Sequence, residues 1–259
     1  MHPILFQLGP IKIYAYGTML SIAFLIGIYK TAFDAEKEGI KKDYIFDLGF
    51  YCVLSAIVGA RLLYIIVNYK FFLENPLEII FFHHGGLVYY GGLIGAFTVS
   101  YIYIKKHNLQ TWQISDLIAP YLALGIGVTR IGCFLNGCCF GKETNSYLGI
   151  SCGADSLAGS FFGKSVVVHP TQLYEFTYCF LLFILLLVFK KYKKFHGQLF
   201  WLFILSYSIL RGINEIFRGD GERGIYWIFS TSQWIGIFTG LAAIIMLSKL
   251  RKNKIKFVQ

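Results

Sequence analysis

The sequence predicts an all-α, polytopic integral membrane protein. Hydrophobic residues make up 56% of the 259 residues and charged residues only 15%, and the mean hydropathy is +0.59. A water-soluble domain of this length could not cover so much apolar surface with polar side chains. Lipid is therefore the expected solvent for most of the chain.

Apolar stretches of membrane-crossing length predict about seven transmembrane helices. A helix needs roughly 20 mainly apolar residues to cross about 30 Å of hydrocarbon. The segments between these stretches are short, so we expect a single transmembrane domain over residues 1–259. The expected spans lie near residues 13–30, 46–69, 86–104, 115–136, 171–189, 198–217 and 226–248.

Basic residues predict the orientation of the chain. Fifteen of the 24 Lys and Arg residues follow odd-numbered spans, and the positive-inside rule places such residues in the cytoplasm. We therefore expect the N-terminus outside and the C-terminus inside, because one span more or fewer in the middle would put basic loops on both faces. The residues concerned are Lys30, Lys37, Lys41, Lys42, Lys105, Lys106, Lys190, Lys191, Lys193, Lys194, Lys249, Arg251, Lys252, Lys254 and Lys256.

Net charge and cysteine content narrow the class of partner. The net charge of +10 is concentrated in these short loops and the tail, where anionic lipid head groups attract it, so no nucleic-acid partner is expected. The six cysteines form no CxxC pair and no paired Cys/His spacing, so no metal site is expected. A disulfide from Cys138 or Cys139 to Cys152 stays open, because the outer face of a membrane can be oxidising.

Ionisable side chains inside the expected spans predict a functional site. A charge at the centre of a span costs roughly 2.5–3.5 kcal/mol on insertion scales, so its presence indicates a role. At about 1.5 Å per residue, the arginines of three spans fall beyond the midplane toward the outside, at the depth of Tyr16 and Glu175. The residues concerned are Arg61, Arg130, Glu175, Arg211 and Glu215, with Arg218 at a helix end.

The sixth expected span carries four polar side chains at spacings of four, four and three, namely Tyr207, Arg211, Glu215 and Arg218. These spacings place them on one helical face, where Glu215 can pair with both arginines. One interpretation is a buried ion pair that holds helices together. The other is an anion site. It is favoured because three intramembrane arginines face only two carboxylates, and because arginine binds phosphate with two parallel hydrogen bonds.

A glycine-rich segment opens the third expected span. Residues 83–92 read HHGGLVYYGG, and helix N-terminal N–H groups beside glycine could approach an anion there. The alternative is close helix packing, which small residues such as Gly91, Gly92 and Gly95 permit in membranes. The sequence leaves both interpretations open.

Two further segments lie at the outer ends of the fourth and fifth spans. Residues 130–141 read RIGCFLNGCCFG, and the glycines with Asn136 predict that the helix breaks into a loop near the outer surface. His169 and Pro170 open the fifth span, with proline at a favourable helix-start position. His169 either caps that helix or takes part in catalysis.

Taken in order, these motifs resemble the prolipoprotein diacylglyceryl transferase family. The similar stretches are YAYG at 14–17, HGG and YGGLIG between 84 and 95, RIGCFLNG at 130–137, HPTQLYE at 169–175 and RGINEIFR at 211–218. The resemblance implies the first step of bacterial lipoprotein maturation. In it, an enzyme without metal or cofactor moves the diacylglyceryl group of phosphatidylglycerol onto the lipobox cysteine of a prolipoprotein signal peptide, releasing glycerol phosphate. It also implies a cytoplasmic (inner) membrane location, with the site facing the outer leaflet.

The resemblance implies roles for individual residues. Arg130 and Arg211 are candidates for stabilising the negative charge of the phosphate leaving group. The nucleophile is the thiol of the substrate, so the enzyme needs no nucleophilic triad, and Tyr16, Tyr90 and His84 are candidates for taking the thiol proton. The further candidates for substrate binding are Asn136, Gly141, Arg61, Glu215, Arg218, His169 and Glu175.

The sequence also departs from the family pattern. Family members often carry His where this chain has Tyr90, and many carry Asn and Glu at the positions of Cys133 and Cys138. A homologue that binds lipid without catalysis is therefore one alternative. A transporter or channel for an anionic solute is another, because arginines line such pathways. The polar residues cluster at one depth, however, and the sequence shows no clear inverted repeat.

Overall fold

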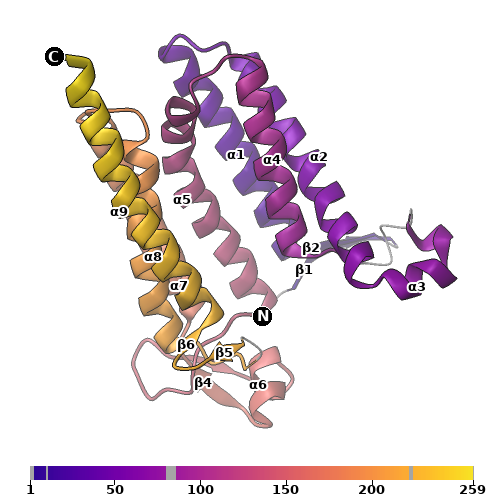
Figure 1. Cartoon of the computed structure of the whole chain (residues 1–259). Coiled ribbons are helices and arrows are strands. Elements are labelled where there is room, and N and C mark those ends of the chain that lie inside the picture. Colours follow the sequence, from indigo (N-terminus) through magenta and orange to yellow (C-terminus); the bar gives the residue numbers. More distant parts are fainter. Residues whose placement is uncertain (1–2, 10, 80–85, 222–223, 259) are drawn as a thin grey trace. The chain divides into compact units, whose positions relative to one another are not determined.

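The computed structural model describes residues 3–9, 11–79, 86–221 and 224–258, and within them it is mostly helical. Six of the described helices are long and apolar enough to cross a membrane. They are α1 (Ala15–Lys37), α2 (Lys42–Val67), α5 (Thr111–Asn136), α7 (Thr171–Lys190), α8 (Gln198–Phe217) and α9 (Thr231–Val258). The expected all-α membrane class is thereby confirmed (Figure 1).

The span expected near 86–104 forms a helix but does not join these six. It is α4 (Tyr89–Lys106), whose 18 residues include four tyrosines and end in two lysines. That composition makes α4 less apolar than the six candidate spans found among the described residues. The count of seven and the outward N-terminus remain predictions.

Short elements connect the helices. Antiparallel pairs join β1 (Ile4–Leu8) to β2 (Ile11–Tyr14), β3 (Ile150–Cys152) to β4 (Val166–Val168), and β5 (Ile225–Tyr226) to β6 (Phe229–Ser230). The short helices are α3 (Tyr69–Glu74), η1 (Pro76–Ile79) and α6 (Leu157–Phe162).

The chain forms two compact units. The first contains residues 1–30 and 115–259, and the second contains residues 31–114. In the first unit, α8 packs against both α7 and α9, and β3, β4 and α6 lie at the opposite end of these helices from the C-terminus (Figure 1). Between α5, α7 and α8 lies a buried apolar cluster of Ala119, Ala123, Leu182, Leu186, Leu199 and Phe203.

In the second unit, α2 and α4 pack so closely that Gly59, Gly91 and Gly95 allow no side chain. A Cβ added at Gly91 would lie 2.3 Å from the carbonyl oxygen of Gly59, and one added at Gly95 would lie 2.4 Å from that of Ser55. Gly91 therefore serves close helix packing of the kind that small residues permit in membranes.

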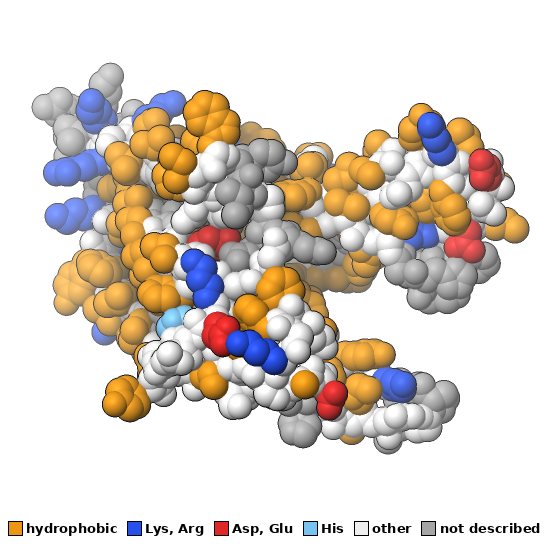
Figure 2. Space-filling view, turned by 90° about the horizontal axis from the view of Figure 1, so that it is seen from below, with side chains coloured by type: hydrophobic (Ala, Val, Ile, Leu, Met, Phe, Trp, Pro, Cys, Tyr) orange, Lys and Arg blue, Asp and Glu red, His pale blue; other side chains and the backbone are white. Residues whose placement is uncertain are grey.

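Large hydrophobic side chains cover the flanks of the helices, as Figure 2 shows. Leu25, Phe50, Phe97 and Phe238 are each more than 60% exposed. Exposure of apolar surface on this scale fits a lipid environment rather than water.

Candidate active site

The centre of the polar network in the first unit is the carboxylate of Glu175. Its Oε2 lies 3.1 Å from Nε of Arg130, and the Glu175 side chain is 2% exposed. Tyr207 donates a hydrogen bond to Oε1 at 3.0 Å, and the amide nitrogen of Asn214 lies 3.3 Å from Oε2. One carboxylate therefore connects α5, α7 and α8, and its buried charge is matched by an arginine and two hydrogen bonds.

On α8 and at its end, Glu215 lies close to both Arg211 and Arg218, as the spacing of these residues predicts. Nη1 of Arg211 lies 2.5 Å from Oε2 of Glu215, and Nη1 of Arg218 lies 4.0 Å from the same oxygen. Arg218 also binds Asp220 with two parallel hydrogen bonds of 3.1 and 2.6 Å. Glu215 thus faces both arginines, and Asp220 is a further carboxylate that sequence reasoning did not place in this set.

The charge balance differs from the expected one. Arg130 pairs with Glu175, Arg211 with Glu215 and Arg218 with Asp220, so each of these arginines has a carboxylate. Of the three arginines in the expected surplus, Arg130 and Arg211 lie in this network, each with one of the two expected carboxylates, whereas Arg61 belongs to the second unit. A bound anion would have to share the arginines with their carboxylates.

Arg61 belongs to the second unit, and its described hydrogen bonds go to backbone carbonyls. Its guanidinium donates hydrogen bonds to the carbonyls of Glu78, Ile79 (3.4 Å) and Gly86 (3.2 Å). Its carbon Cζ lies 5.4 Å from the ring centre of Phe72, and the residue is 4% exposed. Arg61 therefore fastens the segment between α2 and α4, and its proposed role in binding substrate stays a prediction.

The end of α5 is a Schellman turn, and this turn gathers three thiols. Gly137 adopts a left-handed φ of 79°, its N–H binds the carbonyl of Phe134, and the N–H of Cys138 binds the carbonyl of Cys133. This motif brings the third residue before the cap next to the second residue after it, here Cys133 and Cys138. Cys139 is also left-handed, with φ 62°. The sulfur atoms of all three cysteines lie within 4.8 Å of one another.

The thiol cluster contacts Arg130. Nη1 of Arg130 lies 3.8 Å from Sγ of Cys133 and 3.9 Å from Sγ of Cys139. Hydrogen bonds with the Cys133 and Cys139 thiols lower the pKa of the Cys138 thiol. All six cysteines are described and free, so the disulfide to Cys152 is not formed. Sequence reasoning missed this cluster, although glycine four residues after a cysteine at a helix end was the available signal.

Side chains at the start of α7 hold the thiol turn in place. Thr171 donates a hydrogen bond of 2.7 Å to the carbonyl of Cys139, and Gln172 donates one of 2.6 Å to the carbonyl of Cys138. Both side chains are buried. The motif HPTQ therefore positions the loop that follows α5, in addition to starting a helix.

Gly141 lies at a crossing of three backbone segments. Its N–H binds the carbonyl of His169, and a Cβ at this position would lie 2.5 Å from both that carbonyl oxygen and the His169 Cβ, and 2.8 Å from the carbonyl of Phe217. Only glycine allows the segments to approach so closely. The role of Gly141 in this structure is to join the loop that follows α5 to the start of α7 and the end of α8.

His169 does not cap α7, contrary to one of the two expectations. The cap residue is Pro170, which makes no side-chain cap hydrogen bond. The His169 ring instead pairs through Nδ1 with the hydroxyl of Tyr174 at 3.0 Å, and its backbone bonds to Lys142 and Gly141. The ring is thus fixed by the first turn of α7.

The remaining candidates divide between the units. Tyr16 lies in the first turn of α1 in the first unit, where its backbone lies against Gly132 of α5. Asn136 is the last residue of α5. Tyr90 is half exposed on α4 in the second unit. His84 lies outside the described residues.

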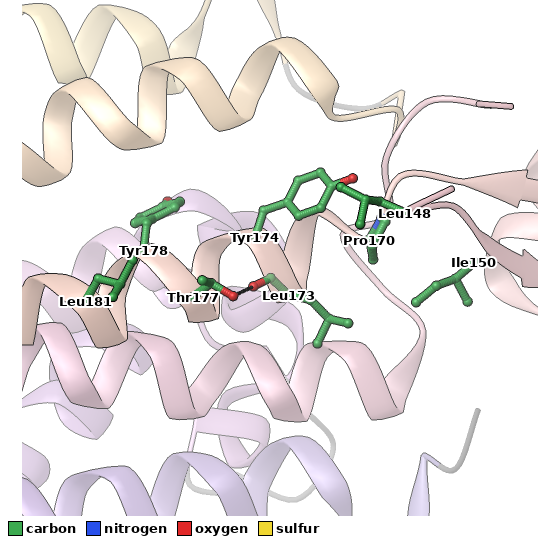
Figure 3. Close-up of a pocket in the computed structure, with 8 residues that line it drawn as sticks. All are labelled: Leu148, Ile150, Pro170, Leu173, Tyr174, Thr177, Tyr178 and Leu181. Atoms are coloured by element: carbon green, nitrogen blue, oxygen red, sulfur yellow. Dashed lines mark hydrogen bonds between the residues drawn. The ribbon is translucent and has the colours of Figure 1, made fainter. Parts of the chain in front are cut away.

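An apolar cavity of about 540 Å³ lies beside α7, as Figure 3 shows. Leu173, Tyr174, Thr177, Tyr178 and Leu181 of α7 line one side, and Leu148, Ile150 and Pro170 complete it. None of its lining residues, all of them described, is an arginine or a carboxylate. The cavity suits a hydrocarbon group, and Tyr178 in its lining lies beside Tyr207 of the charged network, with ring centres 6.4 Å apart.

The fold and site define a polytopic membrane protein with a buried arginine–carboxylate network at one end of its helices. The comparisons with known proteins agree. The family model described as prolipoprotein diacylglyceryl transferase matches residues 3–249. The chain belongs to the prolipoprotein diacylglyceryl transferase family.

Individual relatives are similar over most of the chain. A phosphatidylglycerol–prolipoprotein diacylglyceryl transferase of Clostridium tetani is 37% identical, with 98% of this chain and 100% of the relative covered. Enzyme 2 of the same name from Clostridium perfringens is 33% identical, with 98% of each covered. That of Bacillus cereus is 35% identical over 83% of this chain and 80% of the relative.

Proposed function

We propose that this protein transfers the diacylglyceryl group of phosphatidylglycerol to the lipobox cysteine of a prolipoprotein. The observation that carries the proposal is the setting of Arg130. Buried Glu175 holds its Nε, while Nη1 faces only sulfur at 3.8 and 3.9 Å among its described polar contacts. Thiols are weak acceptors, and a phosphate oxygen forms a shorter, charge-assisted hydrogen bond with a guanidinium. Arg130 is thus oriented for a phosphate.

The reaction requires this kind of group. The thiol sulfur of the substrate cysteine attacks the carbon of the diacylated glycerol that is bonded to the phosphate oxygen. The bond between this carbon and the oxygen breaks as the carbon–sulfur bond forms, and glycerol phosphate leaves with the electron pair. The leaving oxygen gains negative charge in the transition state, so fixed cations aimed at it lower the barrier. The thiol must lose its proton as it attacks. Because the nucleophile belongs to the substrate, the enzyme itself needs no nucleophilic side chain.

Arg211 supplies a second cation. Oε2 of Glu215 lies 2.5 Å from Nη1 of Arg211 and orients its guanidinium, and Nη1 of Arg218 lies 4.0 Å from the same oxygen. In this proposal the phosphate approaches Arg130 and Arg211 while their carboxylates continue to fix the guanidinium planes. Tyr16, whose backbone lies against Gly132 of α5, is our candidate in the first unit for the thiol proton: its hydroxyl oxygen would take that proton while passing its own to the leaving phosphate.

The cavity beside α7 suits the lipid end of the substrate. Its lining is apolar apart from tyrosine and threonine side chains. An acyl chain that enters this groove from the bilayer gains no hydrophobic free energy, because lipid tails are equally apolar, so the groove would position the chain by its shape while the phosphate reacts.

We place the site on the outer side of a bacterial cytoplasmic membrane. In the first unit the basic segment around Lys190–Lys194 and the C-terminal end of α9 lie at the end away from β3 and β4, as Figure 1 allows the reader to follow. Arg130 and Glu175 lie six residues or fewer from the helix ends next to Gly137 and Pro170. The positive-inside rule then assigns these ends to the outside.

The test is transfer of labelled diacylglycerol from phosphatidylglycerol vesicles to a synthetic lipobox peptide, with purified full-length protein. We expect labelling of the peptide, no labelling when its cysteine is replaced by serine, and loss of labelling in Arg130→Ala. The matched control is Lys164→Ala, which removes an exposed cation paired with Glu143. Well-folded wild type that binds phosphatidylglycerol but labels no peptide would support the lipid-binding homologue instead. Movement of an anionic solute across protein-containing vesicles without labelling would support the transporter.

A further inference from the structure

The thiol cluster at the end of α5 has the geometry of a metal site. Three sulfur atoms lie within 4.8 Å of one another. A metal bound to three sulfurs at about 2.3 Å each requires sulfurs about 4 Å apart, so small rotations of the side chains suffice. Two of the three cysteines are partly exposed, which leaves an entry path, whereas Cys133 is buried.

The surrounding backbone holds the three thiols together before any ligand arrives. The Schellman turn fixes Cys133 beside Cys138, and the left-handed Cys139 turns its sulfur back toward Arg130. Buried hydrogen bonds from Thr171 and Gln172 then hold the carbonyls of Cys139 and Cys138. Because the turn is fixed from both sides, little ordering is needed when a ligand binds.

The donor set selects the metal. Sulfur ligands are soft and favour Cu⁺ and Zn²⁺ over hard cations such as Mg²⁺ or Ca²⁺. Zn²⁺ in structural sites takes four protein ligands, but the described residues bring only three such atoms together here. A three-sulfur set therefore favours Cu⁺. We propose that Cys133, Cys138 and Cys139 form a binding site for one monovalent copper ion.

Arg130 connects this site to the proposed reaction. Cu⁺ binding releases thiol protons to solvent and leaves thiolates, whose negative charge the adjacent guanidinium compensates. The Nη1 edge that we assign to the lipid phosphate then faces a copper–thiolate group. On the basis of the proposed function, Cu⁺ inhibits transfer, and the enzyme is sensitive to copper that reaches its site.

The site is tested by binding, independently of activity. Full-length protein in detergent, reduced and kept free of oxygen, is titrated into Cu⁺ held by a coloured chelator, and the loss of chelator colour is measured. We expect one Cu⁺ per chain for wild type and none for the variant with Cys133→Ser, Cys138→Ser and Cys139→Ser. The matched control replaces the other three cysteines, Cys52, Cys152 and Cys179, by serine and should still bind one Cu⁺.

Further variants and competition make the test independent of folding. Cys139→Ser alone, in a loop, should weaken Cu⁺ binding at least tenfold while the protein elutes as a single species in gel filtration. Absence of Cu⁺ uptake by reduced wild type, or equal uptake by the triple variant, would overturn the proposal. Displacement of Cu⁺ by an equal concentration of Zn²⁺ would overturn the choice of copper.

The effect on transfer is measured for each protein as the ratio of its transfer rate with saturating Cu⁺ to its rate without Cu⁺. Saturating Cu⁺ should lower the wild-type rate at least tenfold, and a strong Cu⁺ chelator should restore it, while the ratio stays near one for Cys139→Ser. Wild type that binds Cu⁺ and transfers at an unchanged rate would overturn the inhibition. Wild type that binds Cu⁺ but transfers nothing at all would contradict the proposed function and leave the metal site standing.

Discussion

The two units bury arginine in different ways. Arg130, Arg211 and Arg218 of the first unit each pair with a carboxylate, whereas Arg61 of the second unit donates to the carbonyls of Glu78, Ile79 and Gly86. In Arg61 each of the three guanidinium nitrogens donates to a carbonyl. In Arg130, Glu175 fixes Nε, and Nη1 faces sulfur atoms that an incoming anion can replace. The first arrangement suits a site, and the second suits a fastening of the backbone.

The largest effect should come from removing a site arginine. We expect Arg130→Ala and Arg211→Lys to lower the transfer rate at least about 10²–10³-fold, the usual cost of losing one group that stabilises developing negative charge. Lysine fails at position 211 because it cannot form two parallel hydrogen bonds. Single-turnover transfer of labelled lipid measures the loss. Retained activity in both variants would remove the phosphate role from these arginines.

Gly141→Leu should also inactivate, through crowding. Its Cβ position lies 2.5 Å from the carbonyl oxygen of His169, so the backbone segments that cross there must move apart, and overpacking of this kind costs about 1–3 kcal/mol. Gly153→Leu is the matched control, because nothing lies within 4 Å of a Cβ at that position. Transfer rate and thermal unfolding temperature are measured together. Equal behaviour of the two variants would contradict the crowding argument.

Arg61→Ala should lower the stability of the protein. Removing the guanidinium takes the donor from three partly buried carbonyls, and each such hydrogen bond contributes about 0.5–1.5 kcal/mol. Arg61→Lys should recover only part, since an ammonium lacks the planar fork. We expect the thermal unfolding temperature in detergent to be highest for wild type, lower for Arg61→Lys and lowest for Arg61→Ala. An unfolding temperature that does not change in the alanine variant would show that the carbonyls find other donors.

A smaller loss of stability is expected from Gly91→Ala in the second unit. The added methyl would lie 2.3 Å from the carbonyl of Gly59, so α2 and α4 must separate. Gly27→Ala is the control, because its Cβ meets nothing within 4 Å. We expect a lower unfolding temperature for the first variant only. Similar values for both would indicate that the two helices slide apart at little cost.

The smallest effect should follow Tyr207→Phe, which removes one of the hydrogen bonds to Glu175. Such a bond contributes about 0.5–1.5 kcal/mol, and Arg130 and Asn214 still hold the carboxylate. A decrease of a few-fold in transfer rate is expected. A loss as large as that of Arg130→Ala would mean that the tyrosine, rather than the arginine, sets the position of Glu175.

Pattern-based reasoning was most successful where neighbours in the chain are also neighbours in space. The spacing of Arg211, Glu215 and Arg218 predicted their shared face because a helix repeats every three to four residues. The partner of Arg130 lies 45 positions away in Glu175, and Asp220 follows the end of α8 in a loop. Such pairs depend on how helices pack, so the expected surplus of arginine charge could not be checked from sequence.

The same limit applies to the ends of helices. The carboxylate of Asp116 in α5 accepts hydrogen bonds from the N–H groups of Gly197 and Phe200 at 2.8 and 3.0 Å, and so caps the start of α8. No local sequence motif predicts this contact. The Schellman turn at Gly137 was readable in principle, because glycine marks the left-handed residue. Recognising that Cys139 also turns back toward Arg130 required the structure.

The sequence by itself determined the membrane class, the apolar helices and the family, because hydropathy and short motifs are properties of contiguous residues. The tertiary structure decided which carboxylate accompanies each arginine, that Arg61 binds backbone, and that three cysteines meet beside Arg130. These contacts join residues separated along the chain. Their partners are selected by helix packing and by the need to satisfy every buried polar group, neither of which a linear pattern records.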